Sequence, residues 1–397
     1  MKLTSEKLKH LTGKVSRNVV DLPPSGIRKF FDFAMGMENI ISLGVGEPDF
    51  ATPWGIREAA VYSLERGRTS YTSNRGLPKL RQAIAAYLRK RWRCSYDPEK
   101  EITITVGVSQ GIDLLMRSIL NPGDEVIIFE PCYVSYSPMV LLAGGTPVAL
   151  PTYAKDDFAP DIERLKQAVT PRTKAIFLNY PCNPTGSTFR RADLERIVAL
   201  AKKHDLLLIS DEVYAELSYD EEDHVSLPSI PGAQERTILL SGFSKAWAMT
   251  GWRIGYIAGP EPFISAVVKV HQYSMLCAPI MGQLAAIEAL ESGEEAMKEM
   301  CASYLERRNV IVDGLNRLGL SCNMPHGAFY VFPNIESTGM TGDDFAWKLL
   351  EQKQVALVPG TAFGACGEGH IRCSYATSLT QIQEALNRIE DFLAQRR

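Results

Sequence analysis

The stretch SGFSKAWAMTGWRIGY, residues 241–256, follows an apolar run, TILL at 237–240. The apolar run predicts a buried strand. The stretch after it holds one lysine, Lys245, among small and aromatic residues, and Arg253 comes eight residues later. Glycines at 242, 251 and 255 allow other groups to approach the backbone closely. A lone lysine among such residues at a strand end calls for an explanation.

Similar apolar runs recur along the chain from about residue 100 onward, and segments with helical spacing separate several of them. Uninterrupted apolar runs are typical of strands that are covered on both faces. We therefore predict a large α/β domain with a mostly parallel, seven-stranded sheet. The predicted strands are ITITV (102–106), EVIIF (125–129), TPVAL (146–150), KAIFL (174–178), LLLIS (206–210), TILLS (237–241) and RIGYIA (253–258).

The pattern changes after about residue 260 to long helical segments, among them residues 293–319. Three short strands, AFYVF, VALV and IRCSY, and a last helix, LTQIQEALNRIEDFL, predict a smaller α+β domain. We predict three parts: an N-terminal arm over residues 1–45 that packs with the small domain, a large domain over 46–285 and a small domain over 286–397.

Composition excludes several classes of protein. A net charge of −3 and 22% charged residues give no basic excess for nucleic acid. No stretch is apolar for long enough to span a membrane, and the charged start MKLTSEKLKH predicts no secretory signal. The eight cysteines form no CxxC pair and no zinc spacing, so we predict free thiols, a cytoplasmic location and no metal site.

Polar residues stand directly after the predicted strands. In open α/β sheets, ligands bind beyond the carboxyl ends of the strands, so these residues are expected to share one site. They are Gly107, Val108 and Ser109 after the first strand, Glu130 to Tyr133 after the second, Asn179 to Gly186 after the fourth, Asp211 to Tyr214 after the fifth, and Gly242 to Lys245 after the sixth.

This set of groups matches one cofactor. A helix start at Ser109, with Ser244 and Arg253, suits a phosphate dianion. A desolvated lysine can lose its proton and attack an aldehyde. A buried aspartate, Asp211, can keep a heteroaromatic nitrogen protonated, and Tyr133 can stack on a ring. Phosphate, aldehyde, pyridine nitrogen and ring together predict pyridoxal 5′-phosphate.

Five motifs then carry a resemblance to a family. GEPDF at 46–50, NYPCNPTG, SDEVY, SGFSKAWAMTGWRIGY and RCSYA at 372–376 occur in this order over some 330 residues. In this order and spacing they closely resemble the class I aminotransferases of fold type I pyridoxal-phosphate enzymes. The chain looks like the subgroup that holds many bacterial and archaeal aspartate, alanine and aromatic aminotransferases.

The resemblance implies a catalytic role for three residues. Lys245 would hold the cofactor as a Schiff base and, once released, carry the proton. Asp211 would face the pyridine nitrogen. Tyr214, together with Asn183, would hydrogen-bond the phenolic oxygen of the ring.

The resemblance also assigns the remaining contacts of the cofactor and the substrate. The cofactor's ring would stack on Tyr133. The α-carboxylate of the substrate would be held by Gly46, Asn183 and Arg372, with Arg372 in a bidentate fork. The phosphate would be held by Val108, Ser109, Ser244 and Arg253, and by Tyr71 from the second subunit of a homodimer.

Each residue taken alone has an ordinary structural explanation. Lys245 and Arg372 could be surface or ion-pair residues, Asp211 a helix N-cap, and Asn183 a turn former before a proline. Tyr71 and Tyr133 could be packing aromatics. These explanations are independent of one another, whereas one cofactor accounts for all the residues together.

The predicted function is amino-group transfer between an L-amino acid and a 2-oxo acid, with 2-oxoglutarate as the expected acceptor, in a ping-pong cycle. The alternative on the same fold is a C–S β-lyase, which shares Lys245, Asp211 and Arg372. A transcription regulator with an aminotransferase-like domain needs a preceding helix-turn-helix domain, and about 45 residues before GEPDF are too few for it.

The preferred amino donor is a separate question. In several aspartate-preferring members of the subgroup, the resemblance places a lysine at the helix-opening position that is Ser109 here. A hydroxyl offers no ion pair to a second carboxylate, so we expect donors weighted to neutral or aromatic amino acids. Arg17 or Arg28 of the N-terminal arm could instead supply the missing charge for aspartate.

Overall fold

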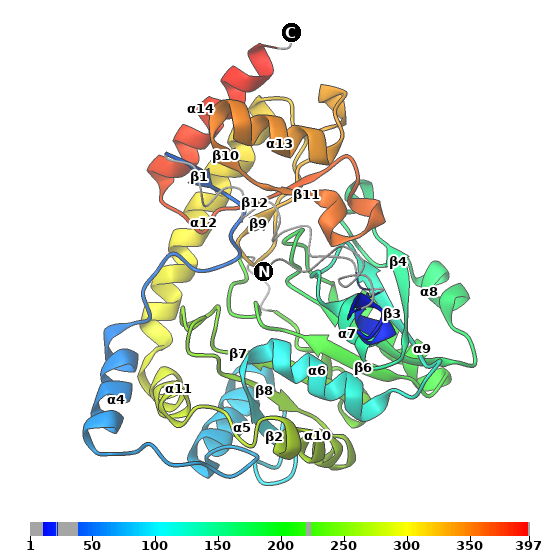
Figure 1. Ribbon diagram of the computed structural model, residues 1–397, viewed down its shortest axis with the longest axis vertical. Coiled ribbons are helices and arrows are strands. Elements are labelled where there is room, and N and C mark those ends of the chain that lie inside the picture. The colour runs from blue at the N-terminus through cyan, green and yellow to red at the C-terminus, as the bar shows by residue number, and fades with distance from the viewer. Residues whose placement is uncertain (1–10, 21, 23–38, 220–223, 396–397) are drawn as a thin grey trace.

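One seven-stranded sheet forms the lower half of the molecule in the computed structural model, which describes residues 11–20, 22, 39–219 and 224–395 (Figure 1). The strands are β2 (Ile102–Thr105), β3 (Glu125–Glu130), β4 (Thr146–Pro151), β5 (Thr173–Asn179), β6 (Leu207–Asp211), β7 (Thr237–Gly242) and β8 (Gly255–Ala258). Their order across the sheet is β2-β8-β7-β6-β5-β3-β4. Only β8 runs antiparallel to its neighbours. The predicted mostly parallel sheet is confirmed.

Helices cover both faces of this sheet, which explains why its strands read as uninterrupted apolar runs. One face packs against α6 (Gly107–Ile119), α7 (Tyr136–Leu142) and α10 (Glu261–Ser274). The other face packs against α8 (Ile162–Ala168) and α9 (Arg191–Lys203) near β3 and β5. It packs against α4 (Trp54–Glu65), α5 (Pro78–Trp92) and α11 (Ile280–Ser292) near β2 and β8.

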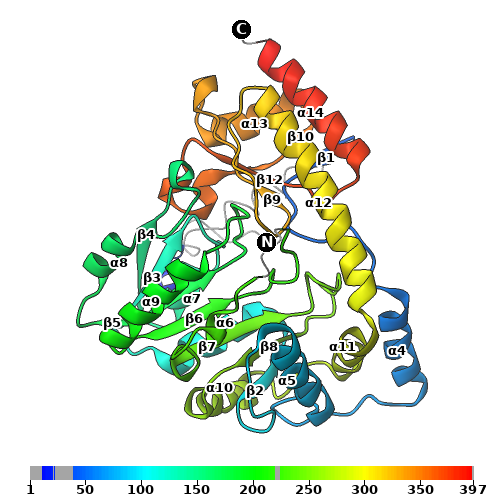
Figure 2. The same cartoon turned by 180° about the vertical axis from the view of Figure 1, so that it is seen from behind.

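The small domain lies above the sheet and is joined to it by the long helix α12 (Glu294–Arg317), which rises along one side of the molecule from the large domain into the small domain (Figures 1 and 2). Its antiparallel sheet has the order β11-β12-β9. A separate parallel pair joins β1 to β10. The strands are β1 (Ile41–Ser42), β9 (Tyr330–Val331), β10 (Val355–Ala356), β11 (Val358–Pro359) and β12 (Ile371–Ser374), and the other helices are α13 (Gly342–Lys353) and α14 (Leu379–Ala394).

Short elements complete the described chain. The helix α2 (Arg17–Val20) lies beside α7 of the large domain. Six single turns of 3₁₀-helix occur in connections: η1 (Ala154–Asp156), η2 (Leu227–Ser229), η3 (Gln234–Arg236), η4 (Glu336–Thr338), η5 (Gly360–Phe363) and η6 (Ala365–Gly367). The predicted domain boundaries near 45 and 285 stay predictions.

Most expected strands differ from the observed ones by one or two residues at an end, and two of the differences have a clear structural reason. The strand expected over 253–258 begins at Gly255, because Arg253 has a φ of 56° and cannot extend a strand. The run VALV divides between β10 and β11, which pair with different partners. All eight cysteines are free. Among the described residues, no helix is long and apolar enough to cross a membrane, and no group of three His, Cys, Asp or Glu side chains is placed to hold a metal.

Candidate active site

Lys245 lies in the turn after β7, and its side chain is partly buried. Its Nζ donates a hydrogen bond to the Gly46 carbonyl at 2.7 Å and lies 5.6 Å from the ring centres of Tyr214 and Phe329. Desolvation by burial lowers the pKa of this amine to about 8. The neutral, nucleophilic form of Lys245 is therefore accessible near neutral pH.

Asp211 is the last residue of β6, and both of its carboxylate oxygens have partners. Oδ2 accepts a hydrogen bond from the Tyr136 hydroxyl at 2.8 Å, and Oδ1 accepts one from the Val213 amide at 3.2 Å. Desolvation by burial raises the pKa of this carboxyl to about 6, against the opposing effect of the Tyr136 hydrogen bond. Asp211 thus caps a turn and also presents a buried acid, so its structural and chemical uses coexist.

Arg372 reaches the same space from β12 of the small domain and is 3% exposed. Its Nη1 donates to Asn183 Oδ1 at 2.9 Å, and Nη2 donates to the Gly44 carbonyl. The guanidinium lies 4.7 Å from the ring centres of Tyr330 and Phe363. Its Nε is buried and has no hydrogen-bond partner among the described residues. An unsatisfied buried donor on a guanidinium fits a carboxylate ligand, which a fork of two N–H groups holds best.

The start of α6 forms an anion site at the edge of the same region. The N-cap, Val106, makes no side-chain capping bond, so no side chain of the cap occupies the first backbone N–H groups. A Cβ on Gly107 would lie 2.6 Å from Arg253 Nη2, so the arginine packs directly against the helix start. A Cβ on Gly255 would lie 2.8 Å from Val108 N. An uncapped helix start beside a guanidinium fits a phosphate.

The other predicted residues take separate positions. The Tyr214 hydroxyl lies 2.8 Å from that of Tyr330. The ring of Tyr133 packs edge-on against Tyr136, with the ring centres 5.5 Å apart. Ser244 is buried beside Lys245. Tyr71 is 82% exposed on its loop, so within one chain it is not part of the buried cluster.

Two contacts of this cluster were not predicted from the sequence. Tyr136 holds Asp211, and Tyr330 holds Tyr214 while stacking on Arg372. Both tyrosines are nearly or fully buried. A tyrosine that is buried usually has a hydrogen-bond partner for its hydroxyl, and this general rule is the only indication of these two contacts that the sequence offered. The pairing itself joins residues 75 and 116 positions apart.

Comparisons with known proteins agree over nearly the whole chain. A family model described as aminotransferase class I and II matches residues 38–389. The aspartate aminotransferase of Pyrococcus abyssi is 46% identical, over 94% of this chain and 97% of that protein. The aromatic-amino-acid aminotransferase 2 of Thermococcus litoralis is 44% identical over the same shares. The solved structure of the aspartate aminotransferase from Thermus thermophilus with maleate is 40% identical with a TM-score of 0.91, and covers 95% of this chain and 99% of that one.

Proposed function

The chain belongs to the class I and II aminotransferases and is a transaminase, and from this premise we propose that it uses pyridoxal 5′-phosphate attached to Lys245. The observation that carries the proposal is Lys245 itself. It is a partly buried lysine whose pKa desolvation lowers to about 8, and its amine is hydrogen-bonded to a carbonyl, not to a carboxylate. Such an amine can attach to an aldehyde and later hold a proton.

The residues of the large domain fit the cofactor. The start of α6 with Arg253 would hold the phosphate, with Val108, Ser109 and Ser244 beside it. Asp211, fixed by Tyr136, would lie opposite the ring nitrogen. The bound cofactor supplies an aldehyde that captures the amino group and a ring that accepts electrons as the α-proton leaves.

The chain's own groups then bind the substrate and move the proton. Arg372 would hold the α-carboxylate through its free Nε and an Nη, with Asn183 fixing the guanidinium. Lys245 Nζ would accept the α-proton and return it on the other side of the transfer. Packing by Tyr214, Tyr330 and Phe363 keeps both basic groups away from water.

We propose a homodimer with Tyr71 contributing to the partner's phosphate site. Support comes from exposed large apolar side chains on and near α4, which are unusual on a monomer surface when they gather. Mixing inactive Lys245→Ala with Tyr71→Phe tests this proposal, because mixed dimers would regain activity if subunits share residues. Absence of recovery after proven subunit exchange contradicts it. The exposed side chains are Trp54, Val61, Tyr62, Leu64 and Tyr71.

The donor class and the location remain proposals of the same kind. The aspartate and aromatic relatives are 46% and 44% identical, so identity favours neither donor. We propose neutral or aromatic donors on the ground of Ser109 at the α6 start, and 2-oxoglutarate as the acceptor. Eight free thiols support a cytoplasmic location.

Half-reactions with single amino acids test the function. Each amino acid is added to the yellow holoenzyme without an oxo acid, and the loss of the cofactor's visible band is followed. Transamination predicts stoichiometric conversion to the amino form of the cofactor with release of one 2-oxo acid. Continuous pyruvate release from a cysteine conjugate, without that conversion, would instead indicate the C–S lyase. Borohydride reduction and peptide mapping must place the label on Lys245.

A further inference from the structure

A second buried carboxylate, Glu212, directly follows Asp211 at the end of β6. Neighbouring residues of a strand point to opposite faces, so the two carboxylates extend away from each other. Asp211 meets Tyr136 on one face of the sheet. Glu212 lies on the other face and is 2% exposed. The role proposed above for Asp211 leaves this second acid unexplained.

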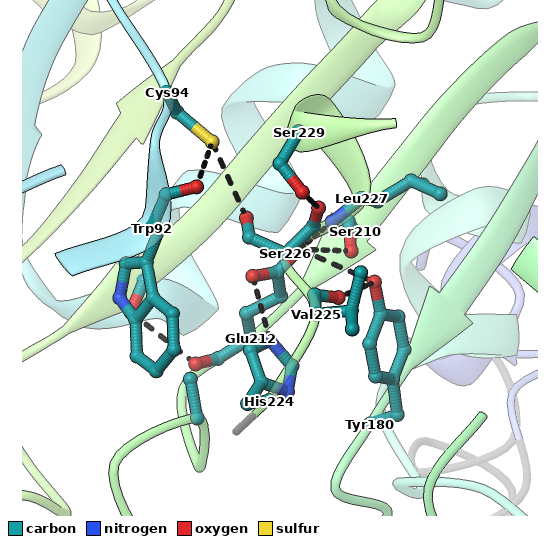
Figure 3. Close-up of polar contacts among 12 residues, drawn as sticks. Trp92, Cys94, Tyr180, Ser210, Glu212, His224, Val225, Ser226, Leu227 and Ser229 are labelled. Atoms are coloured by element: carbon teal, nitrogen blue, oxygen red, sulfur yellow. Dashed lines mark hydrogen bonds and ion pairs between the residues drawn. The ribbon is translucent and has the colours of Figure 1, made fainter. Parts of the chain in front are cut away.

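Glu212 is held by a set of convergent donors, shown in Figure 3. Its Oε1 accepts hydrogen bonds from Ser210 Oγ at 2.8 Å and from the Leu227 amide at 2.9 Å. Its Oε2 lies 2.9 Å from His224 Nε2. No lysine or arginine forms an ion pair with it in the described part of the chain. Hydrogen bonds from several directions thus satisfy both oxygens of this buried carboxylate.

His224 secures this arrangement from the opposite side. Its ring packs edge-on against Trp92, with the ring centres 5.1 Å apart, and at a tilt of 31° against Tyr180, with the ring centres 5.0 Å apart. Its Nδ1 has no hydrogen-bond partner among the described residues. The contact joins the segment after residue 223 to α5 and to the end of β6. A turn clamped in this way fixes the backbone that carries Asp211.

Five titratable groups near Glu212 have a raised pKa to which the charge of Glu212 contributes. The charge adds to the desolvation that raises the pKa of each neighbouring acid, and it also contributes to the raised pKa of Asp211. Besides His224, the titratable groups around Glu212 are Cys94, Tyr96, Tyr180, Asp211 and Tyr256.

We propose that Glu212 is a positioning residue of the transamination site, which clamps the strand end that carries Asp211 and holds a second negative charge behind it. The inference rests on the proposed place of Asp211 opposite the ring nitrogen of the cofactor. A charge behind Asp211 favours positive charge on the cofactor side, just as Asp211 does at shorter range.

Glu212→Gln separates the charge from the packing. The amide oxygen can still accept from Ser210 and Leu227, and the amide nitrogen can donate to His224. The histidine can change tautomer without losing a bond, because its Nδ1 has no partner. We expect a folded holoenzyme whose visible cofactor band titrates about one pH unit lower than in the wild type, since removing a nearby negative charge disfavours the protonated form.

Glu125→Gln is the matched control. Glu125 is also a buried carboxylate, 4% exposed, but it lies at the start of β3. It is therefore at the amino ends of the parallel strands, whereas Glu212 follows the carboxyl end of β6. The variant has the same change of net charge, and Glu125 also accepts hydrogen bonds at its carboxylate, from Thr170 and Arg172. Its band should titrate as in the wild type. Glu212→Asp, which keeps the charge, should lie much closer to the wild type than Glu212→Gln does.

The outcomes distinguish the two proposals. If Asp211→Asn lowers the pH midpoint at which the visible cofactor band titrates and Glu212→Gln does not, the inference about Glu212 is wrong and the role of Asp211 stands. If Asp211→Asn also leaves the midpoint unchanged, the proposed cofactor geometry itself fails. Should Glu212→Gln not fold, the double variant Glu212→Gln/His224→Gln pairs two amides and carries the same expected shift.

Discussion

The two domains contribute to the site in different ways. On the large domain, Asp211 has partners on both oxygens and Lys245 donates to a carbonyl. On the small domain, Arg372 keeps a buried Nε without a partner in the described residues. Hydrogen bonds within the chain thus hold the side chains proposed to face the cofactor, whereas the arginine proposed to bind the substrate has a donor without a partner in the described residues. We infer that the large domain determines the chemistry and the small domain determines how tightly a carboxylate is held.

The largest effect is expected from Lys245→Met on the large domain. The variant removes the covalent attachment and the proton carrier together, so the amino-acid half-reaction should slow by about 10⁴-fold or more. Single-turnover absorbance measurements after reconstitution check this. Lys298→Met, on the exposed face of α12, is the control and should react at the wild-type rate. A half-reaction within tenfold of the wild type would remove Lys245 from the mechanism.

Arg372→Gln tests the small-domain side of the comparison. Loss of a charged fork to the α-carboxylate should lower kcat/KM by about 100-fold, mainly through KM, which corresponds to about 2.7 kcal/mol. The visible band of the bound cofactor should remain. Arg372→Lys keeps the charge without the fork and should recover less than tenfold. A loss confined to kcat would show instead that Arg372 acts on the chemistry, against the division between the domains.

The stability of the cofactor-free protein gives an independent measure of the desolvation of Lys245. Folding lowers the pKa of Lys245 from 10.5 to about 8, so the folded state binds fewer protons there than the unfolded state. The resulting penalty is fully present below pH 8, is about 3 kcal/mol, and fades as the pH rises toward 10.5. Lys245→Met removes it and loses one hydrogen bond, worth about 1 kcal/mol.

The variant should therefore be about 2 kcal/mol more stable than the wild type at pH 7, with a smaller or reversed difference at pH 10.5. Urea unfolding at the two pH values measures both differences. Equal stability of variant and wild type at pH 7 would show that the lysine is solvated in the absence of the cofactor.

The large domain was predictable because its signals are local. Six of its seven strands are largely buried, and most of the predicted polar groups directly follow one of these strands. Two features depend on tertiary context. Arg253 adopts a left-handed backbone, which moves the start of β8. The small-domain strands span two to four residues, too short for a pattern to fix their pairing.

The partners of the site residues could not be read from the sequence for the same reason. Tyr136 contacts Asp211, Tyr330 contacts Tyr214, and His224 contacts Glu212. These contacts form only when β6, α7 and β9 are placed together. Residue type indicated that Asp211 and Lys245 take part in the chemistry, but the shifts of their pKa values arise from burial. Burial is a property of the assembled domains.

The smallest expected effect concerns donor choice, at the α6 start where the large domain meets the substrate. Ser109 offers no charge to a second carboxylate, so the wild type should favour neutral or aromatic donors. Ser109→Lys should raise the ratio of kcat/KM for aspartate to that for phenylalanine by about tenfold, the effect of one partly solvated ion pair. Ser109→Met, of similar length without charge, should not. If wild-type kcat/KM for aspartate already exceeds that for alanine, phenylalanine and tyrosine by about 100-fold, or 2.7 kcal/mol, another cation binds the side chain. Arg17, exposed at the start of α2, would then be the first residue to replace, while Arg28 lies outside the described residues.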